Sequence, residues 1–594
     1  MSSLADHIHL KTLEKLSQKN TIFPKKVKIS IITPLYNTPE QFLKEMLDSV
    51  KCQTYDNWEL CLADGSDEKH AYITFICEEY SREDKRIVYN KLEKNEGISE
   101  NSNRAIEMST GDYLGLLDHD DILHPSALFE VMKVLCYENA DFVYTDEAIF
   151  SSENKTITLR HHKPDFAIDT LRSCNYICHF LVFSRKLMNQ AGVFRNEFDG
   201  SQDYDLILRY VDLATKIIHI PKLLYFWRSH ANSVALDISD KMHAITSGKQ
   251  AIQDHLTRHK ISAQVEVIKL NASFYYRLIY GLIEQPLISI IILNKDNSVL
   301  LKKCLYSVME KTTYCNYEII IVENNSIENS TFDYYEELKQ YTNIHVVYWE
   351  GKGFNYSKLN NFALQYSKGS HLIFLNNDVE IITSNWIEEM LMYSQRVDVG
   401  AVGIKLYYPD NTIQHAGVLL GGGGVAGHYF CGAPRDAIGY MGKLHLVQNM
   451  TAVTAACMMV RRSVFDEAGS FSPEFYATWS DVDLCLKIRR TGYLVVWTPY
   501  AEAYHHEAKT RGYPDTPEKQ KLSDQEIGLF KRKWAKEFDN GDPYYNRNFS
   551  LEKADYFLKE EAVTAILKNQ IKYKLQRYPR LLSFARHIYR FLKN

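Results

Sequence analysis

The chain contains the same pattern of segments twice, and this repeat constrains its fold more than any other feature. Residues 27–50, VKISIITPLYNTPEQFLKEMLDSV, return at 286–308 as PLISIIILNKDNSVLLKKCLYSV. Each copy is a short β-branched run, a polar loop and a helical pattern, and each continues into a second strand pattern. Ser30 matches Ser289, and Asp64 matches Glu323, both 259 residues later. A unit that returns in this way predicts two copies of one domain rather than one large core.

Strand patterns alternate with helical patterns in both copies, which predicts an α/β fold with a Rossmann-like, mostly parallel sheet in each. Sheets of this kind bind their ligands in a crevice beyond the carboxyl ends of the strands. Acidic residues follow the second and fourth predicted strands of each copy: Asp64, Asp118, Asp120, Glu323 and Asp378. We therefore expect one acidic crevice in each copy.

The repeat and the segments around it predict five regions. They are a polar helical lead-in at residues 1–26, a first α/β domain at 27–235, a connector at 236–285, a second α/β domain at 286–512 and a largely helical, basic tail at 513–594. Both α/β domains are long enough to hold a core of their own.

Charge and cysteine usage disfavour several classes of protein. A net charge of −5 argues against a nucleic-acid binder, whose surface is strongly basic. The 11 cysteines form no CxxC pair, which disfavours a zinc ribbon or a disulfide framework and suits the reduced thiols of the cytoplasm. The longest nearly apolar run, residues 452–460, is too short to span a bilayer, and the N-terminus has no apolar signal-peptide region. We expect a cytoplasmic protein that is not integral to a membrane.

The stretch LGLLDHDDILHP at residues 114–125 places three carboxylates and an imidazole at the exit of a predicted strand. One interpretation is a charged turn that caps the next helix, because Asp is favoured at N-caps. The other is a divalent cation site, because hard carboxylate oxygens bind Mg²⁺ or Mn²⁺ and such ions bridge a protein to a diphosphate. The counterpart FLNNDVEI keeps Asp378 at the place of Asp120, which favours the cation site and singles out Asp120 as a ligand.

A second acidic pair opens a predicted helix late in each copy. It reads DGSQDYDL in the first and WSDVDL in the second, and its first acids are Asp203 and Asp481. A helix-start Asp is often only a cap, but here it occurs twice beside another carboxylate set. This suggests that one set holds a metal and the other accepts a proton. Each copy then ends with a histidine in polar company, His230 and His505, for which we favour metal ligation over a purely structural role.

These residues resemble the inverting family 2 glycosyltransferases of GT-A fold, in particular the bacterial tandem type that builds surface polysaccharides. The markers of the first copy are YNTPE, QTYDNWELCLAD, NEGIS, LLDHDD, DGSQDYDL and LYFWR. Those of the second copy are FNYSKLNNFAL, FLNNDVEI, IQHAGVLLGGGGVAGH, AVTAACMMVRR, DVDLCLKI and TPYAEAYHHEA. Together they cover most of residues 27–512 in order, which makes the match specific for the family.

The resemblance implies three sets of roles. The residues implied for donor binding are Asp64, Asp118, Glu323 and Asn377. Those implied for metal binding are Asp120, His230, Asp378 and His505, with His506 as an adjacent alternative to His505. Proton abstraction is implied for Asp203 and Asp481. The expected metal is Mn²⁺ or Mg²⁺. The second copy reads Asn-Asn-Asp where the first reads Asp-His-Asp, so one carboxylate is missing and weaker metal binding is expected there.

The resemblance also implies a bifunctional inverting enzyme that moves sugars from UDP-, dTDP- or GDP-sugar donors to a growing cell-surface glycan, such as an O-antigen or a capsule, on a lipid-linked acceptor. Two alternatives stay open. One is a single catalytic domain beside a domain that only binds acceptor or nucleotide-sugar, and the other is a binding scaffold without catalysis. A nucleotidyltransferase is disfavoured, because its Gly-rich first loop bearing Lys or Arg is absent.

The end of the chain predicts a contact with a surface. Residues 568–594 carry eight Lys or Arg and no acids, with apolar residues at helical spacing between them. A basic amphipathic helix of this kind lies on anionic membranes, or alternatively on the acidic body of its own protein. If the helix lies on a membrane and the acceptor is lipid-linked, we expect the protein to be peripherally associated with the inner face of the cell membrane.

Overall fold

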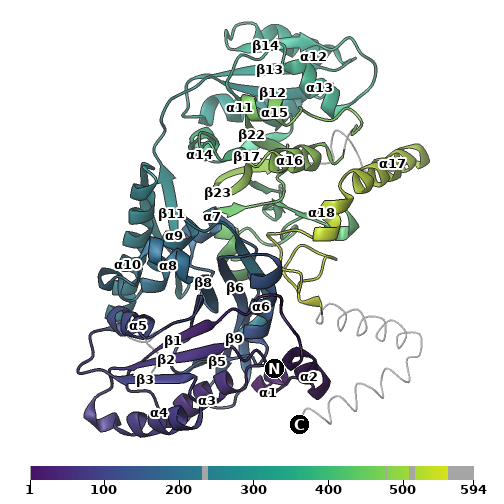
Figure 1. The fold of residues 1–594 in the computed structure, drawn as a ribbon. Helices are drawn as coiled ribbons and strands as arrows, with labels where there is room; N and C mark the ends of the chain where they lie inside the picture. The colour runs from purple at the N-terminus through teal and green to yellow at the C-terminus, as the bar shows by residue number, and fades with distance from the viewer. Residues whose placement is uncertain (1, 231–237, 477, 507–515, 560–594) are drawn as a thin grey trace, which may run out of the picture. The chain divides into compact units, whose positions relative to one another are not determined.

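A computed structural model describes residues 2–230, 238–476, 478–506 and 516–559 of the chain (Figure 1). The chain divides into two compact units, and the main division falls between Gln285 and Pro286. Unit 1 also includes the short segments 391–397 and 446–449, the second of which contains strand β21 (Gln448–Asn449). Each unit holds one copy of the predicted repeat.

Unit 1 is built on a sheet with the strand order β3-β2-β1-β4-β8-β6-β9-β5, in which β7 pairs with β6. Its strands are β1 (Ile29–Leu35), β2 (Trp58–Asp64), β3 (Ile87–Lys91), β4 (Tyr113–Leu116), β5 (Ile122–Leu123), β6 (Phe142–Ser151), β7 (Ile157–His161), β8 (Leu181–Ser184) and β9 (Ile217–Ser229). The first four strands in the order run parallel, whereas β8 is antiparallel to both of its neighbours.

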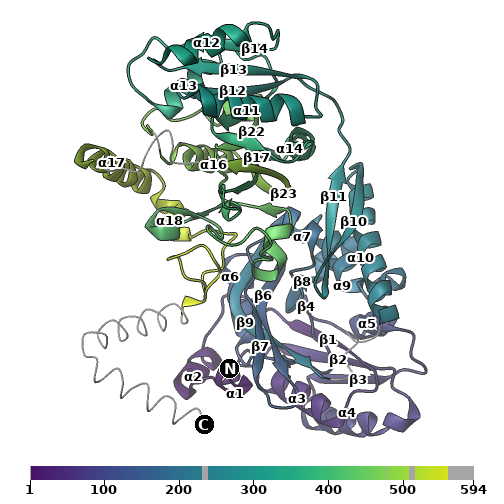
Figure 2. The ribbon, with the colours of Figure 1, turned by 180° about the vertical axis from the view of Figure 1, so that it is seen from behind.

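The helices of unit 1 are α1 (Leu4–Ile8), α2 (Thr12–Lys19), α3 (Glu40–Lys51), α4 (Tyr72–Glu83), α5 (Ile98–Glu107), α6 (Ala127–Tyr137), α7 (Ile168–Ser173), α8 (Arg185–Ala191), α9 (Gln202–Val211) and α10 (Ile238–Arg258). Helices α3 and α4 lie along one face of the β1–β3 block and α5 along the other (Figures 1 and 2). A two-stranded hairpin of β10 (Ala263–Leu270) and β11 (Ser273–Tyr280) ends the unit.

Unit 2 repeats this architecture with the order β14-β13-β12-β15-β22-β17-β23-β16. Its strands are β12 (Ile288–Asn294), β13 (Tyr317–Glu323), β14 (Ile344–Tyr348), β15 (His371–Asn376), β16 (Val379–Ile381), β17 (Val399–Tyr407), β18 (Ile413–His415), β19 (Val418–Leu420), β20 (Ala426–His428), β22 (Cys457–Arg461) and β23 (Leu494–His505). Its helices are α11 (Ser298–Lys311), α12 (Asn329–Leu338), α13 (Tyr356–Ala363), α14 (Trp386–Ser394), α15 (Arg462–Glu467), α16 (Ser480–Arg490), α17 (Pro517–Lys533) and α18 (Ala535–Asn540). The two main strand orders match position by position, which confirms the predicted α/β fold with a repeated Rossmann-like sheet.

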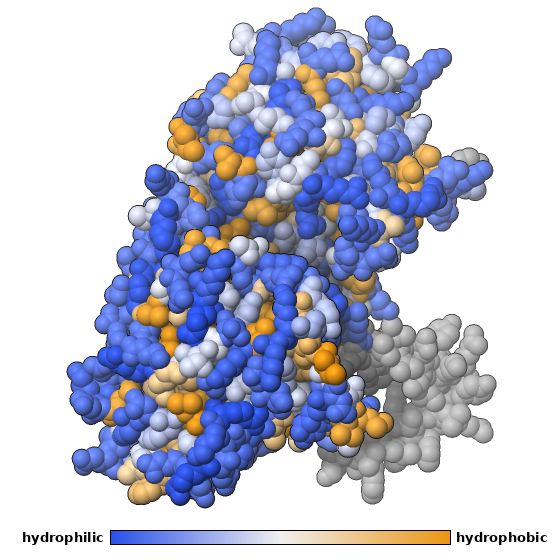
Figure 3. Space-filling view, in the orientation of Figure 1, coloured by the Kyte–Doolittle hydropathy of each residue, from blue (hydrophilic) through white to orange (hydrophobic). Residues whose placement is uncertain are grey.

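The central strands form because their apolar runs can be covered on both faces. Every residue of β1 and β2 is buried, as expected for parallel strands with helices on each side. Helix α3 begins after Pro39 and buries Leu43, Met46, Leu47 and Val50, a helical spacing that lays one apolar stripe on the sheet. The face of the molecule in Figure 3 is mostly hydrophilic, with hydrophobic residues scattered over it.

A buried serine ties the first two strands of unit 1 to the turn before β4. Ser30 donates from Oγ to Glu59 Oε1 at 2.6 Å and accepts the backbone N–H of Gly111 at 2.8 Å. Burial opposes the charge of Glu59, but Lys28 and Ser30 outweigh it and lower the pKa of this carboxyl to about 2. A Cβ at position 111 would lie 2.5 Å from Ser30 Oγ, so the turn requires glycine. We call this arrangement the serine clamp.

Unit 2 contains the same serine clamp. Ser289 Oγ donates to Glu318 Oε1 at 2.7 Å and accepts the N–H of Gly369 at 2.7 Å. A Cβ at Gly369 would lie 2.5 Å from the backbone nitrogen of Ser289. The clamp therefore belongs to the repeated fold rather than to one unit.

No helix within the described parts of the chain is long and apolar enough to cross a membrane. The predicted tail is helical at α17 and α18. The basic segment at 568–594 lies outside the described residues, so its contact with a membrane stays a prediction.

Ser30→Ala is expected to lower the free energy of unfolding of unit 1 by about 1–3 kcal/mol, because it takes one hydrogen-bond donor from a buried carboxylate. Ser289→Ala is expected to do the same to unit 2. Calorimetric unfolding of the full chain measures both effects. Ser17→Ala, on the exposed face of α2, is the control and should change little. Unchanged transitions in both clamp variants would contradict the role of the clamp.

Candidate active sites

The predicted donor-binding acid of unit 1 is the last residue of β2. Asp64 is fully buried and accepts hydrogen bonds from the backbone N–H of Ser66 at 2.8 Å and from the hydroxyl of Tyr89 at 2.8 Å. Lys91 Nζ lies 3.1 Å from the same carboxylate. The strand register sets Asp64 opposite Leu35, so the carboxylate lies at the carboxyl edge of the sheet.

Glu323 ends β13 in the same place of unit 2, opposite Asn294. Its carboxylate accepts from the N–H and the hydroxyl of Ser326, at 2.5 and 2.7 Å, and from the hydroxyl of Tyr335 at 2.7 Å. The predicted donor residue Asn377 is also at this edge, where its amide donates to Asn294 Oδ1 at 2.8 Å.

The predicted metal ligands of unit 1 come together after β4. His230 Nε2 lies 3.0 Å from Asp120 Oδ2, and both side chains are mostly buried. The side chain of Asp118 is 48% exposed, and its Oδ2 lies 3.9 Å from His179 Nε2. A carboxylate and an imidazole that already face each other are a donor set that suits Mn²⁺ as well as Mg²⁺.

The corresponding pair in unit 2 is Asp378 and His505, with Nε2 3.1 Å from Oδ1. Burial disfavours the charge of Asp378, but the hydrogen bond and the field of His505 outweigh it and hold the pKa of Asp378 below its usual value. The other ring nitrogen of His505 lies 2.9 Å from Gln414 Oε1, a contact that orients the imidazole. The ring of His506 faces Glu380 at 3.1 Å instead.

The two histidines do not occupy equivalent strand positions. Asp120 and Asp378 are the matched aspartates of the two units. Two residues after them, Ile122 of β5 pairs with Phe226, and Glu380 of β16 pairs with Tyr504. His505 is thus equivalent to Trp227, and His230 lies three residues further along. The units reach the same carboxylate–imidazole pair from different points of the last strand.

The predicted base of unit 1 lies in the first turn of α9. The carboxylate of Asp203 accepts no hydrogen bond from the residues that the structure describes. Burial, helped by the charge of Asp118 and opposed by His179, raises the pKa of Asp203 to about 6. Such a carboxylate is ionised at neutral pH and still takes up a proton readily.

Asp481 opens α16 in unit 2 and is held more firmly. Its two oxygens accept the backbone N–H groups of Ala455 at 3.1 Å and Val482 at 2.8 Å. The two predicted bases therefore occupy the same helix position in different hydrogen-bonding environments.

The second acid of each Asp-x-Asp-Leu motif has a structural role. Asp205 is fully buried and pairs with Arg195 and, at 2.9 Å, with Arg209. Asp483 is also fully buried and accepts from Lys533 at 2.8 Å and Trp534 at 2.9 Å. Only the first acid of each motif is left for chemistry.

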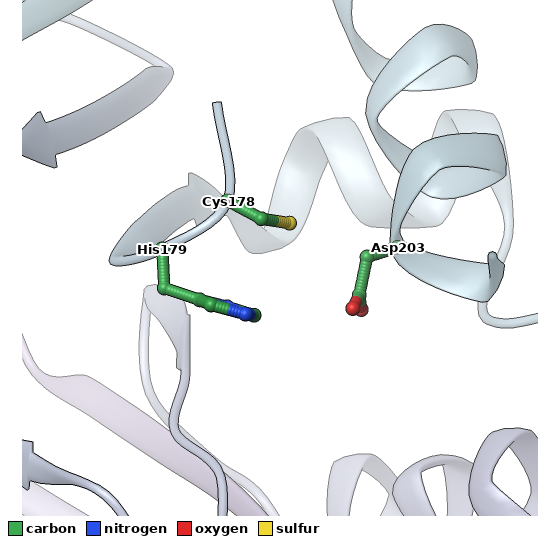
Figure 4. A group of neighbouring side chains, drawn as sticks. All are labelled: Cys178, His179 and Asp203. Carbon is green, nitrogen blue, oxygen red and sulfur yellow. The ribbon is translucent and has the colours of Figure 1, made fainter. Parts of the chain in front are cut away.

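Sequence reasoning did not single out Cys178 and His179, which precede β8 and lie beside Asp203 (Figure 4). His179 Nε2 is 3.9 Å from Asp118 Oδ2, and its ring stacks on Tyr225 with centroids 4.9 Å apart. The second copy of the repeat has no Cys-His pair, so a comparison of the copies gives no signal for these residues.

The model of the family described as glycosyl transferase family 2 matches residues 30–193 and 289–469, which together are more than half of the chain. The chain is 41% identical over 534 residues to an uncharacterized protein y4gI of Sinorhizobium fredii and 34% identical to the O-antigen biosynthesis protein RfbC of Myxococcus xanthus. Each match covers 89% of this chain, but only 58% and 41% of those longer relatives.

Solved structures resemble parts of the chain at low identity. A mannosyltransferase of Pyrobaculum calidifontis, solved with GDP-Man and Mn²⁺, is 15% identical with a TM-score of 0.32 and covers 43% of this chain and 66% of its own. TarS 1–349 of S. aureus, solved with UDP-GlcNAc, is 18% identical with a TM-score of 0.30 and covers 39% of this chain and 72% of its own.

The two acids of α9 are expected to differ in stability when each is replaced by asparagine. Asp205→Asn should lower the free energy of unfolding by about 3 kcal/mol, because it removes the carboxylate that pairs with the buried guanidinium of Arg209 and also with Arg195. Asp203→Asn should raise it at pH 7, because the folded-state pKa lies above the unfolded value and the charged form is disfavoured by folding.

The pH dependence separates the two effects. The gain in Asp203→Asn should fade as the pH falls through about 6 and vanish below about 4, where the wild-type carboxyl is protonated in both states. Unfolding of the full chain at several pH values checks this. Equal losses in Asp203→Asn and Asp205→Asn would contradict the division of roles.

Proposed function

The chain belongs to glycosyl transferase family 2, and from this premise we propose that both units transfer sugars from nucleotide-sugar donors, each with inversion at the anomeric carbon. One observation carries the proposal. Each unit places the same two carboxylate sets at the carboxyl edge of its sheet: a carboxylate–imidazole pair after the fourth strand, and a separate carboxylate at the start of a late helix.

The proposed chemistry is a direct displacement. The hydroxyl oxygen of the acceptor forms a bond to the anomeric carbon as the bond from that carbon to the diphosphate oxygen breaks. The hydroxyl proton passes to Asp203 in unit 1 or to Asp481 in unit 2, and the nucleoside diphosphate leaves with the bonding electrons. A single carboxylate on the face opposite the leaving group suffices, so the configuration inverts.

The remaining residues bind and orient. Asp64 and Glu323, each held by a tyrosine and by a neighbouring backbone N–H, are proposed to contact the nucleobase. Asp120 with His230, and Asp378 with His505, are proposed to hold Mn²⁺ or Mg²⁺, with Asp118 and Asn377 on the donor side. When bound, the divalent ion neutralises the charge that develops on the diphosphate.

The proposed substrates are supported by the family and by the name of one relative. One relative bears the printed name O-antigen biosynthesis protein. We propose that a UDP-, dTDP- or GDP-sugar is the donor and that a lipid-linked cell-surface glycan, such as an O-antigen or a capsule, is the acceptor. Contact with the inner face of the cell membrane through the basic C-terminal segment belongs to the same proposal.

A second candidate assigns catalysis to unit 1 alone. Unit 2 has Asn376 where unit 1 has Asp118, and the amide of Asn376 faces His505 Nε2 at 3.2 Å. With one carboxylate fewer, unit 2 would bind a nucleotide-sugar or the acceptor without transferring a sugar.

Asp203→Asn and Asp481→Asn are each expected to remove one of two transfer steps, by about 100-fold or more, because each takes away the group that accepts the proton. Product analysis with a panel of nucleotide-sugars and an acceptor glycan measures the steps. Thermal shift with the donor should be unchanged, because neither acid is placed on the donor side.

The pH dependence of the wild-type protein is a control for the assignment of Asp203 as the base of unit 1. The step assigned to unit 1 should slow as the pH falls below about 6, where Asp203 becomes protonated. Two steps at full rate in Asp481→Asn would support the second candidate, and a full unit 1 step in Asp203→Asn would contradict the base assignment.

Excess chelator is expected to abolish transfer, and added Mn²⁺ to restore it. His505→Ala should weaken Mn²⁺ binding in unit 2 by roughly tenfold or more, because it removes a ligand. The unit 2 step should then need a correspondingly higher Mn²⁺ concentration to reach half of its maximal rate. His506→Ala is the matched control, since its ring faces Glu380 rather than Asp378. Titration of Mn²⁺ in the presence of the donor measures both variants. Full activity in chelator would remove the metal from the proposal.

A further inference from the structure

We propose that Cys178, His179 and Asp203 form a site for a thiophilic divalent cation, Zn²⁺ above all, within the active site of unit 1. Figure 4 shows the three side chains turned toward one another from two elements: the segment before β8 and the start of α9. A sulfur, a ring nitrogen and a carboxylate oxygen of these residues all lie within 4.8 Å of one another. The group is distinct from the pair of Asp120 and His230.

The geometry is close to that of a zinc site. Zn²⁺ binds sulfur at about 2.3 Å and nitrogen or oxygen at about 2.0 Å, which in a tetrahedron places ligand atoms about 3.5 Å apart. The three ligand atoms all lie within 4.8 Å of one another, so none of their separations exceeds that spacing by more than about 1.3 Å. Asp118 Oδ2, 3.9 Å from His179 Nε2, or a water molecule then completes the tetrahedron.

The chemistry of the ligands separates this site from the proposed Mn²⁺ or Mg²⁺ site. A thiolate favours Zn²⁺ strongly over Mg²⁺ and Mn²⁺, which prefer oxygen. Within the described residues the carboxylate of Asp203 accepts no hydrogen bond, so its oxygens are available to a cation. Binding replaces the S–H bond of Cys178 with a sulfur–metal bond and releases the proton to solvent.

The repeat shows that the fold does not require this cluster. Val182 of β8 pairs with Gly115, and Met459 of β22 pairs with Ile373, which is the counterpart of Gly115. Val182 is therefore equivalent to Met459. Counting back along the chain makes Cys178 and His179 equivalent to Ala455 and Ala456. In unit 2 the N–H of Ala455 donates to Asp481 instead. The cation site is therefore a property of unit 1 alone.

Another cluster in unit 1 is not a comparable metal site. Asp212, His255 and His259 also bring three ligand atoms within 4.8 Å. However, Arg172 donates from Nε to His255 Nε2 at 3.1 Å, so the other nitrogen of that ring carries the proton and cannot bind a metal. Arg258 already pairs with Asp212 at 3.0 Å.

The consequence of a filled site rests on the proposed function of Asp203. An oxygen bound to Zn²⁺ cannot accept the proton of the acceptor hydroxyl, so the ion should inhibit the unit 1 step. Unit 2 has alanines at the two positions and should not respond. The cation site itself requires no catalytic role, and its test can be made without substrates.

The experiment is a titration of the full chain with Co²⁺, read by the thiolate-to-cobalt charge-transfer band in the near ultraviolet. The wild type should develop this band, and Zn²⁺ should displace it. Cys178→Ser should abolish the band, and His179→Ala should weaken Co²⁺ binding by roughly tenfold or more. Cys174→Ser is the matched control, because this nearby thiol faces the Thr170 carbonyl at 3.6 Å and should leave the band intact.

Each outcome decides one point. A wild type without the band, or a band that survives in Cys178→Ser, overturns the site. If the band behaves as expected but Zn²⁺ leaves the unit 1 step at full rate, the inhibition is overturned while the site stands. If Asp203→Asn retains full transfer activity, the base assignment fails, and the cobalt band still reports on the site.

Discussion

The serine clamp is the contact on which the placement of both sites depends. It joins β1 to β2, and β12 to β13, near the beginnings of the strands, through hydrogen bonds of 2.6 and 2.7 Å to a buried glutamate. Side chains alternate along a strand, so a slip of one residue would turn Asp64 or Glu323 to the opposite face. A register fixed at one edge of the sheet therefore sets the chemistry at the other edge.

The sequence predicts those parts of the fold and site that are local or repeated. The carboxyl-edge positions of Asp64, Asp120 and their counterparts follow from strand pattern and offset. The antiparallel course of β8 and β22 does not, because it is set by pairing between strands far apart in the chain. The sequence also predicts that His230 and His505 occupy matched positions. The strand register shows instead that His230 lies three residues beyond the position equivalent to His505. Alignment of the two copies identifies the residues that both units share. It cannot identify Cys178 and His179, because unit 2 has alanines at the equivalent positions.

The two units keep their scaffold and differ at their strand ends. The clamp, the strand order and the buried second acid of each helix motif occur in both. At the carboxyl edge of the sheet, by contrast, Asp118 is replaced by Asn376, and Cys178-His179 by Ala455-Ala456. Substitution is tolerated there because loops at the carboxyl edge carry binding functions without holding the core together. One scaffold can thus carry two sites with different preferences.

Charge is where this difference is largest. Unit 1 has Asp118, Asp120 and Asp203 at the carboxyl edge of its sheet. It also has the fully buried Asp121, whose pKa is raised by burial and by the neighbouring Asp120 and Asp118. Unit 2 has Asn376 and Val379 at the equivalent positions of Asp118 and Asp121. Like charges that the fold holds together favour any cation that joins them. With the carboxylate of Asp118 in place of the amide of Asn376, unit 1 should be the stronger cation binder of the two.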